Sequence, residues 1–388
     1  MAIQQECARR IRRLQTELEK RDLDGALFAY PIDIYYFSGT RPNALLWIPT
    51  AGDPVLLVRK SLSRALAESA VADVRTFPPS RELPSVLGAA RRVGLTFDVL
   101  PVQQLHFLNK VLPGCDFVDI SALNRELRSI KSAWEMEKMK ESAARLCAVF
   151  ARIPEFLRPD MRELDLSAEI EYRARKQGCE GYVRLRAFNQ ELFRGIAASG
   201  ESAARSGFFD GPATGSGLSS AAAHGASTAP IARNAPILVD YTGVFEGYIV
   251  DMTRMFVFGE LHPEMRKAFD VALEIQDYLT ENLRPGQDCA ELFAGAVALA
   301  EAAGLGNHFM GAPGEQAKFV GHGVGLELDE LPILAQGFQV PLQLGQTVAV
   351  EPKFAFPGKG VIGIENTFAV GPEGGTRLTR LADDLIQI

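Results

Sequence analysis

The segment VDYTGVFEGYIVDMTR, residues 239–254, restricts the fold of this chain more than any other. Its apolar and β-branched residues predict two buried antiparallel strands joined by a tight turn. Yet the segment also carries Asp240 and Asp251. If the turn lies at Phe245-Glu246, residue i pairs with residue 491 − i, and the two aspartates are directly opposed. Their Cβ atoms would be about 5 Å apart, so the carboxylates would repel each other unless a cation lay between them.

A second pair of acidic residues follows from the same reasoning. The segment VAVEPKFAFPGKGVIGIENTFAV contains two strand-like runs around a Pro-Gly-Lys-Gly turn. A hairpin centred on Gly358 pairs residue i with residue 716 − i, so Glu351 faces Glu365. For the first pair alone, one aspartate could point outward, or both could be solvated at a sheet edge. Two such pairs in one domain favour a metal site.

A site of this kind also needs a nitrogen ligand, and the segment FVGHGVGLELDELP supplies His322 between two glycines. A histidine in such a turn can also be structural, but four nearby acids favour the ligand interpretation. Carboxylate-rich sites suit Mn, Co, Fe or Zn, and two such ions can hold a bridging hydroxide. The predicted ligands are Asp240, Asp251, His322, Glu351 and Glu365.

The rest of the chain reads as two domains. Short apolar strands alternate with helical segments up to about residue 125, which predicts an α/β domain over residues 1–127. The second domain, residues 128–388, begins with long helical runs and ends in strands and turns. Helices are predicted over residues 3–21, 61–70, 83–91, 101–111, 132–157, 163–177, 262–282 and 288–303. Strands are predicted over residues 25–30, 44–50, 54–59, 237–243 and 247–257.

Residues 195–235 are rich in glycine, alanine and serine, with GSGLSSAAAHGAS at their centre. A low-complexity linker is one interpretation. Short strands and an active-site loop are the other, because small residues let backbones approach closely. The lone His224 within this segment favours the second interpretation.

Composition limits the partners and the compartment. The net charge of −7 argues against nucleic acid as the main partner. We see no signal peptide in the polar N-terminus MAIQQECARR, and no apolar run long enough to span a membrane. The five cysteines are spread along the chain without a CxxC motif, so they read as free thiols. We therefore expect a cytoplasmic protein.

The order Asp, Asp, His, Glu, Glu resembles the pita-bread metallopeptidase family, which includes methionine aminopeptidases, Xaa-Pro aminopeptidases, prolidases and the metal-free creatinases. The motifs VDYTGVFEGYIVDMTR, GHGVGLE, VEPKF and GIENTF carry the resemblance. Their spacings are more similar to the Xaa-Pro branch. The resemblance implies a creatinase-like N-terminal α/β domain followed by a pita-bread catalytic domain.

The resemblance also implies roles for single residues. The five predicted ligands match the family's metal ligands, and Glu351 matches the residue that shuttles protons from the bridging water. His224 matches a histidine that contacts the substrate near the scissile carbonyl. The N-terminal domain is similar to domains that help to form dimers, so a homodimer is expected.

The chain departs from the family pattern at five positions, one of which is Met255, where threonine is common. Asp329 stands where a second histidine would bind the substrate, and an ionised aspartate cannot donate a hydrogen bond. Ile333 replaces the arginine that clamps the carboxylate of a dipeptide in prolidases. Gly363 and Asn366 stand near Glu365 where arginine and aspartate are common. Asp329 is retained as a substrate-binding candidate.

These observations favour a metal-dependent exopeptidase of the Xaa-Pro aminopeptidase type, acting on a peptide or small amide. The first alternative is a creatinase-like hydrolase of a non-peptide C–N bond. The second is a non-catalytic pita-bread module that binds peptides.

Overall fold

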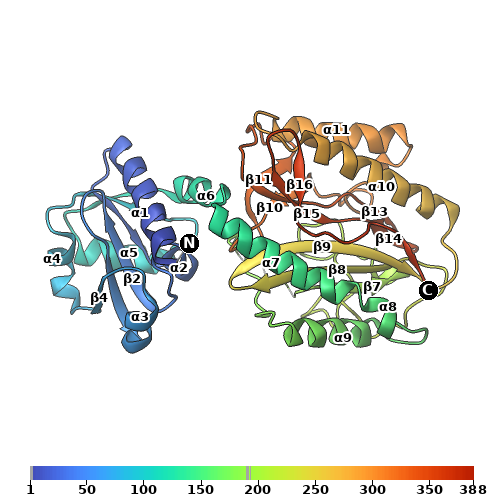
Figure 1. The fold of residues 1–388 in the computed structure, drawn as a ribbon, viewed down its shortest axis with the longest axis horizontal. Coiled ribbons are helices and arrows are strands. Elements are labelled where there is room, and N and C mark those ends of the chain that lie inside the picture. The colour runs from blue at the N-terminus through green and yellow to red at the C-terminus, as the bar shows by residue number, and fades with distance from the viewer. Residues whose placement is uncertain (1–2, 189–191, 193) are drawn as a thin grey trace. The chain divides into compact units, whose positions relative to one another are not determined.

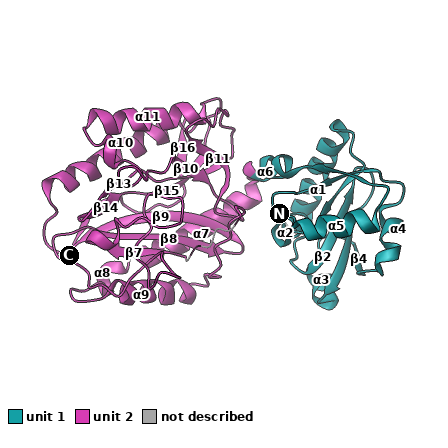
Figure 2. Ribbon diagram, turned by 180° about the vertical axis from the view of Figure 1, so that it is seen from behind, with its two compact units in different colours: residues 1–128 teal, residues 129–388 magenta. Residues whose placement is uncertain are grey.

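The structure is a computed structural model that describes residues 3–188, 192 and 194–388. The chain divides into two compact units, Met1–Arg128 and Ser129–Ile388, which are coloured separately in Figure 2. Among the described residues, no helix has both the length and the apolar character needed to cross a bilayer. The five cysteines are free thiols.

Unit 1 is built on a mixed six-stranded sheet with the order β4-β3-β2-β1-β5-β6. Its core joins Leu27, Trp47, Leu57 and Val93 from neighbouring strands to Leu108 from a covering helix. The strands are β1 (Gly25–Phe28), β2 (Asn43–Pro49), β3 (Val55–Lys60), β4 (Asp73–Thr76), β5 (Arg92–Leu95) and β6 (Asp116–Asp119). The helices are α1 (Ile3–Lys20), α2 (Pro31–Ser38), α3 (Leu62–Glu68), α4 (Leu83–Leu87), α5 (Val102–Val111) and α6 (Ser121–Ser129), with the short turn η1 (Ser80–Glu82).

Unit 2 contains a four-stranded sheet (β17-β9-β8-β7), a five-stranded sheet (β11-β10-β12-β15-β16) and the hairpin β13-β14. The first sheet comprises β7 (Gly195–Ser199), β8 (Ile237–Phe245), β9 (Tyr248–Val257) and β17 (Ile386–Gln387). The other strands are β10 (Phe319–Gly323), β11 (Glu330–Ala335), β12 (Thr347–Val350), β13 (Lys353–Phe356), β14 (Gly360–Gly363), β15 (Asn366–Val370) and β16 (Gly375–Arg377).

Helices cover these sheets on both sides (Figure 1). α7 packs on β8 and β9, and α9 packs on β7, whereas α10 and α11 pack against the other strands. The elements are α7 (Ala133–Phe150), α8 (Ile153–Phe156), α9 (Glu163–Lys176), α10 (Pro263–Asn282) and α11 (Cys289–Ala302), with the turns η2 (Gly200–Ser202) and η3 (Gly306–His308).

The predicted register of the β8–β9 hairpin is wrong, because the turn lies one residue later in the chain than predicted. Asp240 pairs with Thr253, and Asp251 pairs with Thr242, so the two aspartates are diagonal neighbours on one face. The turn is Glu246-Gly247, and both residues have positive φ angles, 49° and 84°. This conformation suits the two-residue turn that matches strand twist, and it moves the turn one residue along the chain.

The predicted register of the C-terminal hairpin is confirmed. Lys353 pairs with Gly363, and Val350 pairs with Asn366, as the centre at Gly358 requires. Glu351 and Glu365 occupy the matching positions between these two pairs. The prediction succeeds here because the symmetric Pro-Gly-Lys turn lies at its expected centre.

The single helix predicted over residues 132–157 is interrupted in the structure. α7 ends at Phe150, and the short α8 begins at Ile153. Pro154 explains the break, because its ring would clash with the carbonyl of Phe150 in a continuous helix. The helix α2 was not predicted at all. Residues 200–236 form turns and irregular segments after β7.

Candidate metal centre

The five predicted ligands come from five separate places in unit 2. Asp240 lies on β8 and Asp251 on β9, while His322 lies on β10. Glu351 directly follows β12, and Glu365 directly precedes β15. The two sheets are joined beside them, since the backbone N–H of Thr253 donates to the carbonyl of Glu365 at 3.3 Å.

Strand alternation directs the aspartates away from the covering helices. Tyr241, the neighbour of Asp240, faces α9, where its hydroxyl lies 2.7 Å from Ser167 Oγ. Met252, the neighbour of Asp251, faces Cys147 of α7. Since successive side chains of a strand point to opposite faces, Asp240 and Asp251 point to the side on which β12, β14 and β15 pack.

A lysine that the sequence analysis did not consider lies among these residues. Lys353 Nζ is 2.9 Å from Asp240 Oδ2, 2.7 Å from Glu351 Oε2 and 2.8 Å from Glu365 Oε2. Its side chain is buried, with an exposed fraction of 1%. The ammonium group therefore links three of the five predicted ligands.

The remaining contacts favour a cation beside His322. Its Nδ1 is 2.8 Å from the carbonyl oxygen of Leu328, which assigns the ring proton to Nδ1. The lone pair of Nε2 is then available, and Nε2 lies 3.6 Å from Glu351 Oε1. Donor atoms of Asp251, His322 and Glu365 all lie within 4.8 Å of one another. A backbone partner on the second ring nitrogen is typical of a metal-binding histidine.

The electrostatics show that the cluster lacks positive charge. Burial raises the pKa of Asp251 well above its ordinary value, and the Asp240 carboxylate raises it further. Burial likewise raises the pKa of Glu365, with Asp251 adding to the effect. Burial alone would lower the pKa of Lys353, but the surrounding carboxylates outweigh it and raise that pKa. The lysine is thus charged, and it does not neutralise all four acids.

The residues present therefore fit one divalent ion. Asp251, His322 and Glu365 offer carboxylate and imidazole donors to it, and such a set suits Zn, Fe or Mn. A second ion would have to share the carboxylates of Asp240, Glu351 and Glu365 with the ammonium group of Lys353. The number and identity of the ions remain predictions.

Neighbouring groups hold these ligands in place. Thr253 Oγ1 donates to Glu365 Oε2 at 2.9 Å, and the backbone N–H of Met252 donates to Asp251 Oδ1 at 3.0 Å. The buried Arg254 donates to the Glu365 carbonyl and to Asn366 Oδ1. The asparagine at position 366 thus still takes part in the hydrogen bonds behind the site.

His224 is buried, and neither of its ring nitrogens has a hydrogen-bond partner among the described residues. Its ring meets the ring of Phe209 edge-on, with 5.7 Å between centroids. Burial lowers its pKa, while the charge of Asp240 acts in the opposite direction. The ring is therefore a neutral, unsatisfied group near Asp240, and its catalytic role stays a prediction.

Asp329 uses its carboxylate on a neighbouring backbone segment. Oδ1 accepts the N–H of Arg186 at 2.7 Å, and Oδ2 accepts the N–H of Ala187 at 2.8 Å. These bonds give Asp329 a positioning role for the segment before the undescribed residues. Its substrate-binding role stays a prediction.

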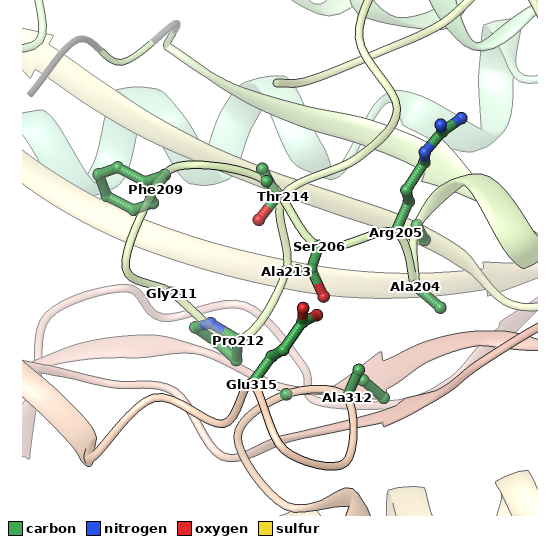
Figure 3. Close-up of a pocket in the computed structure, with 14 residues that line it drawn as sticks. Ala204, Arg205, Ser206, Phe209, Gly211, Pro212, Ala213, Thr214, Ala312 and Glu315 are labelled. Carbon is green, nitrogen blue, oxygen red and sulfur yellow. The ribbon is translucent and has the colours of Figure 1, made fainter. Parts of the chain in front are cut away.

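A cavity of about 170 Å³ lies in unit 2, and neither His224 nor any of the five predicted metal ligands is among its lining residues. Phe209, which contacts His224, lines this cavity together with Arg205, Ser206 and Glu315. Figure 3 shows the Glu315 carboxylate directed toward Ser206 and the Arg205 guanidinium directed away. The Phe209 ring thus contacts both this cavity and the imidazole of His224.

The sequence contained a pattern that could have placed Lys353 in the acid cluster. It lies two residues after Glu351, so an extended backbone places both side chains on one face. The opposite residue in the predicted register is Gly363. A side chain at position 363 would crowd the lysine, because a Cβ there would lie 2.7 Å from Lys353 Cγ.

Comparisons with known proteins agree with this architecture. Residues 137–372 match the model of metallopeptidase family M24, and residues 10–130 match that of the creatinase/prolidase N-terminal domain. The Xaa-Pro dipeptidase of Pyrococcus furiosus is 28% identical over 383 residues, which cover 97% of this chain and 99% of that protein.

Solved structures share the fold. An Xaa-Pro dipeptidase from Bacillus anthracis superposes with a TM-score of 0.83 at 25% identity, covering 98% of this chain and 100% of that one. For an X-Pro aminopeptidase from Thermotoga maritima MSB8 the TM-score is 0.81 at 23% identity, with 97% and 99% covered. The predicted fold class, a creatinase-like α/β domain followed by a pita-bread domain, is confirmed.

Proposed function

This chain belongs to metallopeptidase family M24 and is a peptidase enzyme, and we propose that it cleaves the bond before proline at the N-terminus of peptides. One observation carries the proposal. Five ligand-type residues in or beside separate strands gather at one place. The Nδ1–H of His322 donates to the carbonyl of Leu328, which leaves Nε2 facing the acids. This arrangement suits metal-assisted hydrolysis of an amide.

The protein's own residues have distinct tasks in this proposal. A divalent ion held by Asp251, His322 and Glu365 would supply Lewis acidity toward a carbonyl group and a water molecule. Glu351 takes a proton from the attacking water and delivers it to the leaving proline nitrogen. The neutral His224 donates its one N–H to the oxygen that becomes negative. The dinuclear centre expected from the sequence would compete with Lys353 for oxygen atoms.

A dipeptidase is the second candidate, because relatives named Xaa-Pro dipeptidase align over nearly the whole chain. A dipeptidase has to hold a carboxylate close to the scissile bond. Ile333 pairs directly with His322 across β10 and β11 and offers no charge for this task. The aminopeptidase assignment therefore remains our proposal.

Peptide turnover in Mn²⁺-containing buffer tests the proposal. We expect Ala-Pro-Ala and its C-terminal amide to be cleaved with a kcat/KM at least about tenfold above that of Ala-Pro, because Ile333 offers no charge to the dipeptide carboxylate. Preference for Ala-Pro would establish the dipeptidase instead. Cleavage of neither, with metal bound, would favour the creatinase-like hydrolase of a non-peptide C–N bond.

A matched pair of variants tests the proton carrier. Glu351→Gln keeps the shape of the side chain but removes the base, so we expect kcat to fall by about 10²–10⁴-fold. The control is Glu264→Gln, which changes an exposed residue paired with Lys359, and its kcat should equal that of the wild type. Unchanged turnover in Glu351→Gln would remove this residue from the proposed mechanism.

We also propose a cytoplasmic homodimer, as expected from the sequence. The five free thiols support the compartment. Light scattering coupled to size-exclusion chromatography would measure the assembly, and a monomeric mass would refute the dimer.

A further inference from the structure

The backbone position and the surrounding residues fix the side chain of Lys353 within the acid cluster. It begins β13, and its side chain is fully enclosed. Gly363 lies directly opposite and leaves the space that the lysine stem fills. Burying an ammonium group is costly unless charged partners surround it, and here three carboxylates do so at 2.7–2.9 Å.

The ammonium group of Lys353 binds one oxygen atom of each of three carboxylates. Its partners are Asp240 Oδ2, Glu351 Oε2 and Glu365 Oε2. An ion that joined these three residues would have to share their carboxylates with the ammonium, because one oxygen atom of each already binds Lys353. On the other side, Glu351 Oε1 faces His322 Nε2.

The donor atoms that remain are those of a single site. Asp251, His322 and Glu365 approach one another within 4.8 Å. Asp251 is not among the hydrogen-bond partners of Lys353, and its Oδ1 accepts the backbone N–H of the adjacent Met252. The geometry thus separates a position held by the ammonium from a position open to an ion.

Charge balance leads to the same division. Four carboxylates face one ammonium, so three negative charges stay uncompensated when all the acids are ionised. One divalent ion leaves a single negative charge. Two divalent ions beside the ammonium would exceed the charge of the four carboxylates unless a hydroxide were bound as well, and repulsion between cations is weakly screened in a buried place.

We propose that Lys353 takes the place of one of two divalent cations, so that this centre binds a single ion through Asp251, His322 and Glu365. The lysine is a permanent counter-charge for Asp240, Glu351 and Glu365. When the ion leaves, the centre then keeps the single positive charge of the ammonium.

Metal stoichiometry tests this proposal without any substrate. The full chain is stripped with a chelator and titrated with Mn²⁺, using calorimetry for the number of bound ions and EPR for their spacing. The wild type should bind one Mn²⁺ with the hyperfine pattern of an isolated ion. Lys353→Ala removes the ammonium and opens its space, so it should bind two, with the exchange coupling of ions about 3.5–4 Å apart.

The control is Lys359→Ala, which removes an exposed lysine of the same hairpin, paired with Glu264. It should keep one ion. Two coupled ions in the wild type would overturn the proposal even if Lys353→Ala failed to fold, and so would a folded Lys353→Ala that binds only one.

The melting temperature provides an independent test of the proposal. Without metal, Lys353→Ala leaves four buried carboxylates with no ammonium, so its Tm should fall below that of the wild type, and Mn²⁺ should raise its Tm by a larger interval. An equal Mn²⁺ response in both would count against the proposal. A chain that binds one ion yet cleaves no Xaa-Pro peptide would refute the proposed function and leave this inference standing.

Discussion

At the scale of single residues, Lys353 and Gly363 form the most informative pair in the catalytic unit. They are direct partners across β13 and β14. Arginine is common at this position in the family that the sequence resembles, whereas this chain has Gly363 there and a buried cation on the facing strand. The positive charge near Glu365 therefore comes from the neighbouring strand, from which the lysine reaches Asp240, Glu351 and Glu365 together.

His224 gives a pH prediction at the same scale. Burial lowers its pKa, so the folded chain binds the proton less readily than the unfolded chain, whose histidine pKa is about 6.5. The stability that neutral His224 contributes is present above that value and is lost as the pH falls through the folded pKa. We expect the free energy of unfolding to fall more between about pH 8 and about pH 5.5 in the wild type than in His224→Gln.

Urea unfolding of the metal-free chain measures this difference. Both proteins keep the acid cluster, so its titration largely cancels in the comparison. The exposed His106→Gln serves as the control and should follow the wild type. Parallel profiles for wild type and His224→Gln would show that His224 is not held neutral by burial.

At the scale of elements, the first residue of α9 anchors the segment that carries His224. Glu163 accepts the N–H of Ser199 at the end of β7. It also accepts bonds from Ser202 Oγ and from both the N–H and the Oγ of Ser227. The carboxylate is buried, so a single helix terminus fixes both ends of the irregular segment between β7 and residue 227.

Glu163→Gln should loosen this anchor. The amide can accept at only one atom, and its NH₂ would face a donor, so we expect a loss of about 1–3 kcal/mol in the free energy of unfolding. Peptide turnover should also fall, because the His224 segment is less well fixed. The control is Glu169→Gln, which changes an exposed residue of the same helix that pairs with Arg173. It should lower the free energy of unfolding by less than about 1 kcal/mol. Equal losses would remove the anchoring role.

At the scale of the whole molecule, each compact unit contains one of the two tryptophans. Trp47 is buried in the core of unit 1. Trp134 lies on α7, with its ring edge-on to Tyr248 at 5.9 Å between centroids. The fluorescence of each therefore reports on the unfolding of one unit, whereas all the predicted metal ligands belong to unit 2.

Metal binding should therefore stabilise the two units unequally. Trp47→Phe leaves only the reporter in unit 2, and Trp134→Phe leaves only the reporter in unit 1. At 100 times the dissociation constant a ligand stabilises by about 2.7 kcal/mol, which corresponds to about 5–10 °C in Tm for a unit of this size. We expect Mn²⁺ to raise the transition in Trp47→Phe and leave the transition in Trp134→Phe in place. Equal shifts would show that the units unfold as one.

The sequence by itself determined which residues could form a site and how they are spaced. Strand alternation and turn chemistry are local properties, so the register around Gly358 and the matching positions of Glu351 and Glu365 followed from a short segment. The order of the acids and His322 likewise predicted the family. The helix predicted over residues 3–21 is likewise a local property, and it is observed as α1.

Only the tertiary structure decided how these residues meet. The register of β8 and β9 depends on Glu246, a non-glycine residue that adopts a positive φ angle, and on the elements that pack against both faces of the hairpin. The partners of Lys353 lie up to 113 residues away. Which charges share a buried space is set by the packing of two sheets, because contacts of that range arise only when the chain is folded.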